Sequence, residues 1–146
     1  HKNDLAVSYQ GREFTIEVKS LQTNSIRHEG DDYRGAFQCD ASDRRTVVLP
    51  RGRKVETTCL LVGGFDLVAV NLFAFRHQWE FAFALNRDLP HTVSTKYSPA
   101  QRKYLLATLM KISLPPQLPF VSDPFVLLDR LVAEPEPGHL LIKTKK

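Results

Sequence analysis

The first twenty residues alternate between apolar and polar side chains on both sides of a Gln10-Gly11 pair, and no other feature constrains the fold as strongly. Alternation with a period of two is typical of a half-buried strand, so residues 5–9 and 12–20 are predicted to form a β-hairpin. A turn centred between Gln10 and Gly11 pairs residues whose numbers sum to 21. A slip of one residue would turn the apolar side chains of one strand to solvent, which specifies the register.

This register places three charged side chains on one face of the hairpin. Asp4 lies opposite Glu17, and Lys19 points the same way two residues further on. Two directly opposed carboxylates repel each other unless a cation lies between them. Mg²⁺ prefers oxygen ligands and completes its shell with water and phosphate oxygens, while an ammonium group stabilises charge on a scissile phosphate. The three side chains therefore predict a metal-dependent phosphodiesterase site, with a solvated surface hairpin as the alternative.

Asp4, the twelve residues that follow it and then Glu17-Val18-Lys19 resemble the motif of the PD-(D/E)xK nuclease superfamily. The resemblance implies a restriction-endonuclease-like fold, an α/β domain in which helices flank a mixed β-sheet that carries an antiparallel catalytic hairpin. It also implies that Asp4 and Glu17 bind Mg²⁺, which Mn²⁺ could replace, with the carbonyl of Val18 as a further ligand. By the same resemblance, Lys19 positions or activates the attacking water. Asn3 stands where the motif has Pro.

Two further groups are candidates for the site. Gln38 lies beyond the lysine strand, where some related nucleases place a Gln near the catalytic centre, although a structural Gln in a strand is the alternative. Five cations crowd one short region, and they are predicted either to bind DNA phosphates or to form a solvated basic hairpin: Arg44, Arg45, Arg51, Arg53 and Lys54. The formal charge of +4 and the pI of about 9.2 suit a polyanionic partner. If this region does not bind DNA, the polar segment 23–33 is the other candidate path.

The rest of the chain is predicted to be strands up to residue 85 and helices after it. A polar loop with a short helix is expected over 21–33, and strands over 36–42, 46–49 and 55–62. A strand pair over 65–75 and 79–85 is expected to turn at Arg76-His77, with four alternating side chains in the core rather than stacked on bases: Trp79, Phe81, Phe83 and Leu85. A capping box at Ser98–Gln101 predicts a helix that continues to Ser113, and Asp123-Pro124 predicts a second one.

Length and composition indicate one domain over residues 1–134 and a Pro-rich, basic tail over 135–146. The chain begins at His1 and enters directly into a strand, so we expect N-terminal elements to precede it. No run of eighteen apolar residues is present, which predicts that no segment spans a membrane. Cys39 and Cys59 are expected to be reduced, buried thiols of a cytoplasmic protein, with a disulfide as the alternative. The scattered histidines lack zinc-ligand spacing.

Together these features predict a Mg²⁺-dependent endonuclease that hydrolyses DNA in restriction, phage defence or DNA repair, in the cytoplasm of a bacterium or archaeon. A homodimer or a larger assembly is expected, because cutting both strands usually needs two active sites. The alternative from another class is a catalytically silent, nuclease-like module that binds DNA or assembles a complex. A third interpretation, a resolvase for branched DNA, differs in substrate and not in chemistry.

Overall fold

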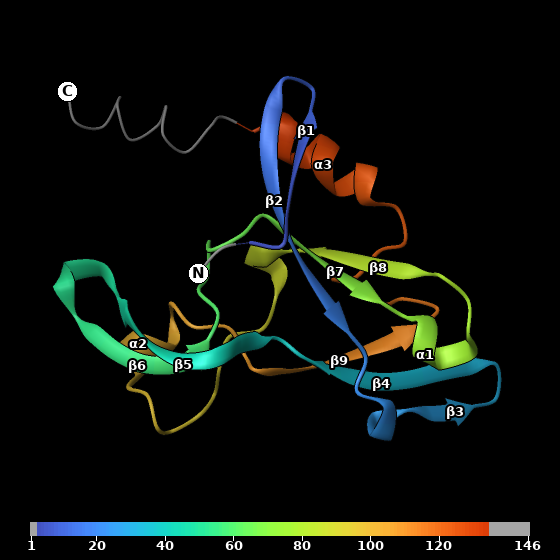
Figure 1. Cartoon of the computed structure of the whole chain (residues 1–146), viewed down its shortest axis with the longest axis horizontal. Coiled ribbons are helices and arrows are strands. Elements are labelled where there is room, and N and C mark those ends of the chain that lie inside the picture. The colour runs from blue at the N-terminus through green and yellow to red at the C-terminus, as the bar shows by residue number, and fades with distance from the viewer. Residues whose placement is uncertain (1–2, 135–146) are drawn as a thin grey trace.

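The predicted hairpin forms the edge of a mixed four-stranded sheet in the computed structural model, which describes residues 3–134. β1 (Leu5–Tyr9) runs antiparallel to β2 (Arg12–Ser20), β2 runs parallel to β7 (Leu67–Asn71), and β7 runs antiparallel to β8 (Phe81–Leu85) (Figure 1). The register is the one predicted, since every β1–β2 pair sums to 21, from Leu5 with Ile16 to Tyr9 with Arg12. Gln10 and Gly11 both have positive φ, at 51° and 75°, as the two central residues of a type I′ hairpin turn require.

The remaining strands of residues 3–134 form two smaller sheets. One has the order β3 (Arg27–Glu29), β4 (Asp32–Gln38) and β9 (Leu109–Leu114), and all of its strands are antiparallel. The other is a ribbon of β5 (Asp40–Val48) and β6 (Lys54–Cys59), which projects from the body of the molecule (Figure 1). Single helical turns connect the strands: Thr23–Ser25, Pro50–Gly52, α1 (Phe73–Arg76), Asn86–Asp88 and α2 (Pro99–Arg102). The fold class is therefore mixed α/β, as predicted, with more sheet than helix.

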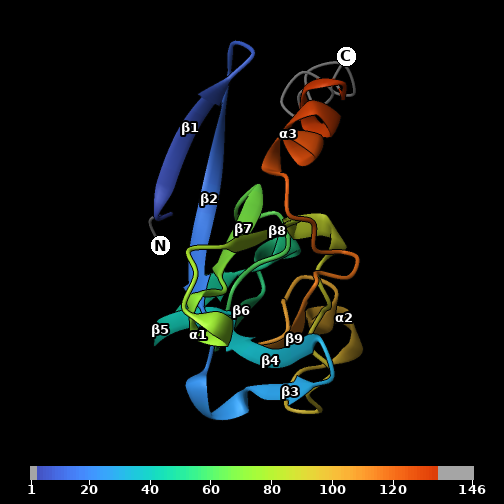
Figure 2. The same ribbon diagram turned by 90° about the vertical axis from the view of Figure 1, so that its right-hand side faces the viewer.

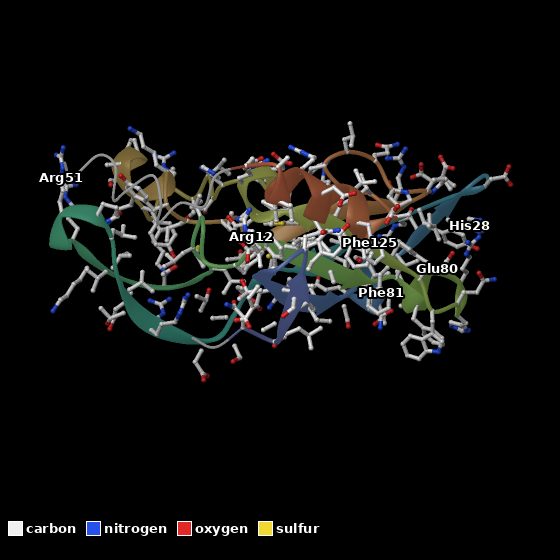
Figure 3. All side chains as sticks on the ribbon, turned by 90° about the horizontal axis from the view of Figure 1, so that it is seen from above. Arg12, His28, Arg51, Glu80, Phe81 and Phe125 are labelled. Atoms are coloured by element: carbon white, nitrogen blue, oxygen red, sulfur yellow. The ribbon has the colours of Figure 1, made fainter. Side chains whose placement is uncertain are left out.

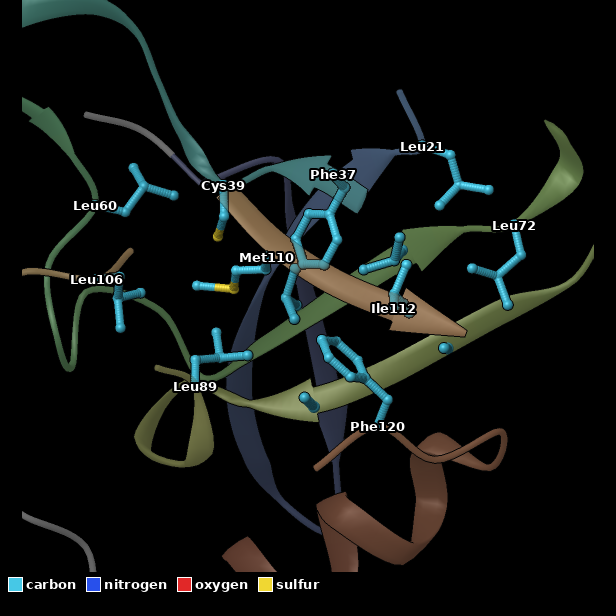
Figure 4. Packing of buried hydrophobic residues seen from close by; sticks show 14 of the residues in the cluster. Leu21, Phe37, Cys39, Leu60, Leu72, Leu89, Leu106, Met110, Ile112 and Phe120 are labelled. Carbon is cyan, nitrogen blue, oxygen red and sulfur yellow. The ribbon is translucent and has the colours of Figure 1, made fainter. Parts of the chain in front are cut away.

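The two faces of the four-stranded sheet pack against different partners. α3 (Pro124–Val132) begins where predicted, with the Asp123 side chain accepting a hydrogen bond from the Phe125 N–H, and it lies beside the β1–β2 hairpin (Figure 2). It buries a small core against the first face: Phe14, Leu67, Leu85, Leu127 and Leu128. The second face carries Val68 and Val70 into the main core, where Phe37, Met110 and Phe120 converge (Figure 4). Since side chains alternate along β2, Glu17 and Lys19 share this second face.

The predicted helix over residues 99–113 is wrong beyond its first turn. Its capping box is present, because Ser98 accepts from the Gln101 N–H and Gln101 accepts from the Ser98 N–H, but α2 ends at Arg102. The segment that follows contains strand β9 instead. Buried Met110 and Ile112 alternate there with exposed Leu109 and Lys111, which is a period of two. The capping box therefore starts a real helix, but the chain leaves the helix after Arg102, and residues 109–114 pair with β4.

Three other expectations need correction. Segment 21–33 contains the expected short helix, Thr23–Ser25, but it also contains strand β3, which pairs with β4, in place of an open loop. The strand pair over 65–85 is shorter than predicted, because α1 ends in a left-handed His77 between its strands. Trp79 and Phe81, both predicted to lie in the core, are 75% and 36% exposed, whereas Ala82 and Ala84 on the opposite face of the strand are fully buried. The main core packs against the alanine face, and α3 covers only the Phe83–Leu85 end of the other face.

Other expectations concern the ends of the chain and the cysteines. Both cysteines are free and buried, as predicted. No helix among residues 3–134 is long and apolar enough to cross a membrane. The predicted tail over 135–146 lies outside the described residues.

Candidate active site

Asp4 and Glu17 face each other at the point where β1 begins. Glu17 lies on the inner strand β2, beside Val68 of β7, and it is 1% exposed, whereas Asp4 is exposed to solvent. The Asp4 N–H donates to the Glu17 carboxylate. In return, the Asp4 Oδ2 accepts from the Val18 N–H at 2.8 Å. These two hydrogen bonds hold the carboxylates together, as the hairpin register predicted.

Lys19 joins the pair from the same face of β2. Its Nζ lies 3.8 Å from the Glu17 Oε2 and donates to the carbonyl oxygen of Asp40 at 2.8 Å. The Lys19 side chain is 18% exposed, so its ammonium group is largely shielded from solvent. The carbonyl of Asp40 therefore fixes the ammonium group beside Glu17, which brings all three predicted catalytic side chains together.

The environment of Glu17 disfavours its ionised form. Burial is the main cause that raises the pKa of Glu17 above its ordinary value of 4.5, and the negative charge of Asp4 adds to it. Lys19 and the Asp4 N–H act in the opposite direction without reversing the shift. A carboxyl group in this position gains from a cation that binds its ionised form.

The donor atoms around this pair fit a hard divalent cation. Val18 directs its N–H toward Asp4, and an antiparallel strand directs the N–H and C=O of one residue to the same side. The carbonyl of Val18 therefore points to the Asp4 side, where it could serve as a third oxygen ligand. The Oδ1 of Asn3, next to Asp4, is buried without a hydrogen-bond partner in the structure and is a further oxygen at this end of the hairpin.

The small number of protein oxygens at this site helps to decide which metal ion it could bind. Among residues 3–134, no three or more His, Cys, Asp or Glu side chains converge in a way that could hold a metal. A site made of two carboxylates and backbone or amide oxygens leaves coordination positions for water and phosphate, as Mg²⁺ sites commonly do. The residues present therefore fit Mg²⁺ or Mn²⁺ better than zinc.

The raised pKa of Glu17 makes stability depend on pH in a defined direction. Just above pH 4.5, the folded state binds more protons than the unfolded state, so stability falls as pH rises through the raised pKa of Glu17. The Gln side chain of the Glu17→Gln variant cannot ionise, so this variant does not lose stability as pH rises. In EDTA at about pH 8, we expect the variant to be more stable than the wild type by on the order of 1 kcal/mol, or about 2–4 °C in Tm.

Thermal melts at about pH 8 and pH 4 test this expectation. The advantage of the variant should shrink at the lower pH, where wild-type Glu17 is itself protonated. A Glu17→Gln protein that is less stable than the wild type at both pH values would contradict the assigned cause.

Gln38, the other side chain predicted for the site, contacts Gln22 in the structure. It is exposed on β4, and its Oε1 accepts a hydrogen bond from the Gln22 amide at 2.5 Å, which is the structural role considered as the alternative. The next residue, Cys39, lies closer to the centre and is fully buried. Burial raises the pKa of the Cys39 thiol to about 12, and the nearby Lys19 only partly offsets this, so the thiol stays protonated and unreactive.

The predicted basic region is the β5–β6 ribbon, and four of its five cations are exposed: Arg44, Arg51, Arg53 and Lys54. Arg51 lies at its tip, at one end of the long axis of the molecule (Figure 3). Arg45 differs, because it is half-buried and its Nη1 donates to the Thr57 carbonyl across the ribbon at 2.8 Å. Since β5 begins at Asp40, which binds Lys19, the ribbon starts at the candidate active site.

Comparisons with known proteins identify no relative of this chain. No protein-family model, no curated protein and no solved structure matches it.

Proposed function

We propose that this protein is a Mg²⁺-dependent endonuclease that hydrolyses phosphodiester bonds in DNA, with a restriction-endonuclease-like fold. The observation that carries the proposal is the contact of Asp4 with Glu17 beside the Lys19 ammonium group. The mixed sheet supports it, because the Glu17–Lys19 strand lies between an antiparallel strand that follows Asp4 and a parallel strand.

Each residue has a defined part in this proposal. Asp4, Glu17 and the carbonyl of Val18 would hold the metal ion, which supplies a water of lowered pKa and offsets charge on the phosphate. Lys19, fixed by the Asp40 carbonyl, orients the attacking water and stabilises negative charge at the scissile phosphate. The exposed carboxylate of Asp4 marks the side from which DNA reaches the otherwise buried pair. Restriction, phage defence or DNA repair in a prokaryotic cytoplasm is the proposed setting, with a dimer or larger assembly for double-strand cleavage.

A second candidate is a catalytically silent module that binds DNA or assembles a complex. The burial of the site favours the silent module. Glu17 is 1% exposed, and the Lys19 ammonium group already donates to the Asp40 carbonyl, so neither group is open to a substrate. The two proposals differ in whether the pair binds metal and whether DNA is cut. Incubating supercoiled plasmid with the protein in Mg²⁺ and in EDTA separates them: the endonuclease nicks plasmid only in Mg²⁺, and a silent module in neither.

Metal binding should stabilise the folded protein through the same pair. An ion that binds only the native state stabilises it by RT ln(1 + [L]/Kd), about 1.4 kcal/mol at ten times Kd. The effect should grow with pH, because the ion binds the ionised form of Glu17, whose pKa is raised. Thermal melts with and without MnCl₂ measure this shift, and Asp4→Asn combined with Glu17→Gln should abolish it. A shift that survives in the double variant would place the ion elsewhere.

A further inference from the structure

A cavity of about 540 Å³ lies on the three-stranded sheet, away from Asp4 and Glu17. Its walls come from the segment Ser25–Glu29, from β4 and β9, and from the segment Gln117–Phe120 that follows β9. Sites for small molecules typically have volumes of about 300–1,000 Å³ and combine apolar walls with a few polar groups. The cavity is therefore large enough to hold a ligand, and its lining indicates which kind.

The charged part of the lining is strongly basic. Arg27 of β3 lies directly opposite Arg34 of β4, and like charges in this position destabilise an antiparallel pair. Lys111 of β9 adds a third cation on the same face, since Arg34 pairs with Ser113, two residues beyond Lys111. Among residues 3–134, Glu29 is the one acidic residue that lines the cavity, and its Oε2 lies 3.2 Å from the Arg34 Nε. Three cations against one anion favour an anionic ligand with more than one acceptor oxygen.

The remaining lining suits an aromatic, weakly polar group attached to that anion. Leu118 and Pro119, with the nearly buried Ile112 and Phe120, form the apolar lining, and Ser25, Ser113 and Gln117 supply hydrogen-bonding groups. Leu118 is 85% exposed although it is a large apolar residue, so this wall remains available to a ligand. A nucleotide has both groups, because its phosphate is anionic and its base is aromatic and weakly polar.

We propose that this cavity binds one nucleotide unit of a nucleic acid strand, with its phosphate on Arg27, Arg34 and Lys111 and its base against Leu118 and Pro119. The identity of the strand as substrate DNA rests on the proposed nuclease function. The wall formed by β4 leads toward the active site, because the chain runs from Arg34 to the end of β4 at Gln38 and then to Asp40 of β5, whose carbonyl binds Lys19. Six residues of extended chain span about 20 Å, so a strand seated here passes the catalytic hairpin within a few nucleotides.

Binding of a fluorescein-labelled oligothymidylate, followed by anisotropy in EDTA and at low salt, tests the proposal without requiring cleavage. Arg27→Gln and Lys111→Gln should each weaken binding about tenfold, because each removes a charge-assisted hydrogen bond to phosphate. Glu29→Gln should tighten binding, because it removes the anion that competes for Arg34. Lys96→Gln, a matched change at an exposed lysine that does not line the cavity, should bind like the wild type.

Competition distinguishes the possible occupants. Thymidine monophosphate should displace the oligonucleotide at lower concentration than inorganic phosphate, because its base contacts the apolar wall, yet bind more weakly than the oligonucleotide. Equal competition by phosphate and the mononucleotide would overturn the nucleotide assignment, and a mononucleotide as tight as the strand would replace the strand with a free nucleotide. Arg27→Gln and Lys111→Gln variants that bind like Lys96→Gln would remove the site altogether. Failure to cut plasmid in Mg²⁺ contradicts the proposed nuclease but leaves these EDTA measurements unchanged.

Discussion

Asp4→Asn and Glu17→Gln should each lower the rate of Mg²⁺-dependent plasmid nicking by about 10³-fold or more, since each removes a charged ligand of the proposed metal ion. Amide replacements suit this test better than alanine. Glu17 is 1% exposed and faces the main core, so Glu17→Ala would leave a buried cavity. A fall in activity could then result from unfolding and not from the loss of a metal ligand. Gln keeps the volume and still accepts the Asp4 N–H, which removes the charge alone.

Lys19→Gln should behave differently from the two carboxylate variants. We expect the metal-dependent rise in Tm to persist while the nicking rate falls about 10²–10³-fold, the usual effect of removing one group that stabilises transition-state charge. Glu13→Gln is the matched control for Glu17→Gln, because Glu13 lies on the same strand and face but is exposed, and it should nick at the wild-type rate. Wild-type nicking by Glu17→Gln would refute the assignment of the site.

The β1–β2 hairpin could be predicted from the sequence because its register depends on local information. The Gln10-Gly11 turn and the division into an apolar and a polar face each specify the same pairing, and Leu5 pairs with Ile16 as expected. The burial of Glu17 could not be predicted in this way. It depends on residues 36–40, which cross the end of β2 through the Leu21–Phe37 bridge and the Gln22 N–H to Ala36 carbonyl hydrogen bond. Only the Glu17–Lys19 end of the polar face is therefore covered by a distant part of the chain, while Glu13 on the same face stays exposed.

The same limit explains the errors elsewhere. The Ser98–Gln101 capping box is a local signal and forms as predicted, but whether the chain continues as helix depends on the partner that β4 offers to β9. The hydrogen bond from Lys19 to the Asp40 carbonyl could not be predicted from the sequence, because every residue has a carbonyl. The charge of Arg45 alone predicts phosphate binding, whereas its contact with the Thr57 carbonyl depends on how β5 pairs with β6.

Replacing both Arg44 and Arg53 by Gln should reduce the slope of log affinity for DNA against log salt by roughly two units. Each phosphate contact contributes about 0.9 to this slope. Both side chains are exposed on the β5–β6 ribbon that starts at Asp40, beside Lys19. Phosphate contacts position the protein on DNA without reading sequence, so sequence preference should not change. Fluorescence anisotropy with duplex DNA over a series of salt concentrations, in EDTA, measures the slope.

Two controls make this result specific to the ribbon. Lys96→Gln combined with Arg130→Gln removes the same charge from other exposed positions and should leave the slope nearly unchanged. Arg45→Gln should also preserve most of the slope, because its guanidinium group already bonds the Thr57 carbonyl. If the Arg44→Gln, Arg53→Gln protein folds and binds DNA with the wild-type slope, the ribbon does not contact phosphate. The backbone of the DNA would then have to follow segment 23–33, where Arg27 faces Arg34, and the cavity there would be its main electrostatic contact.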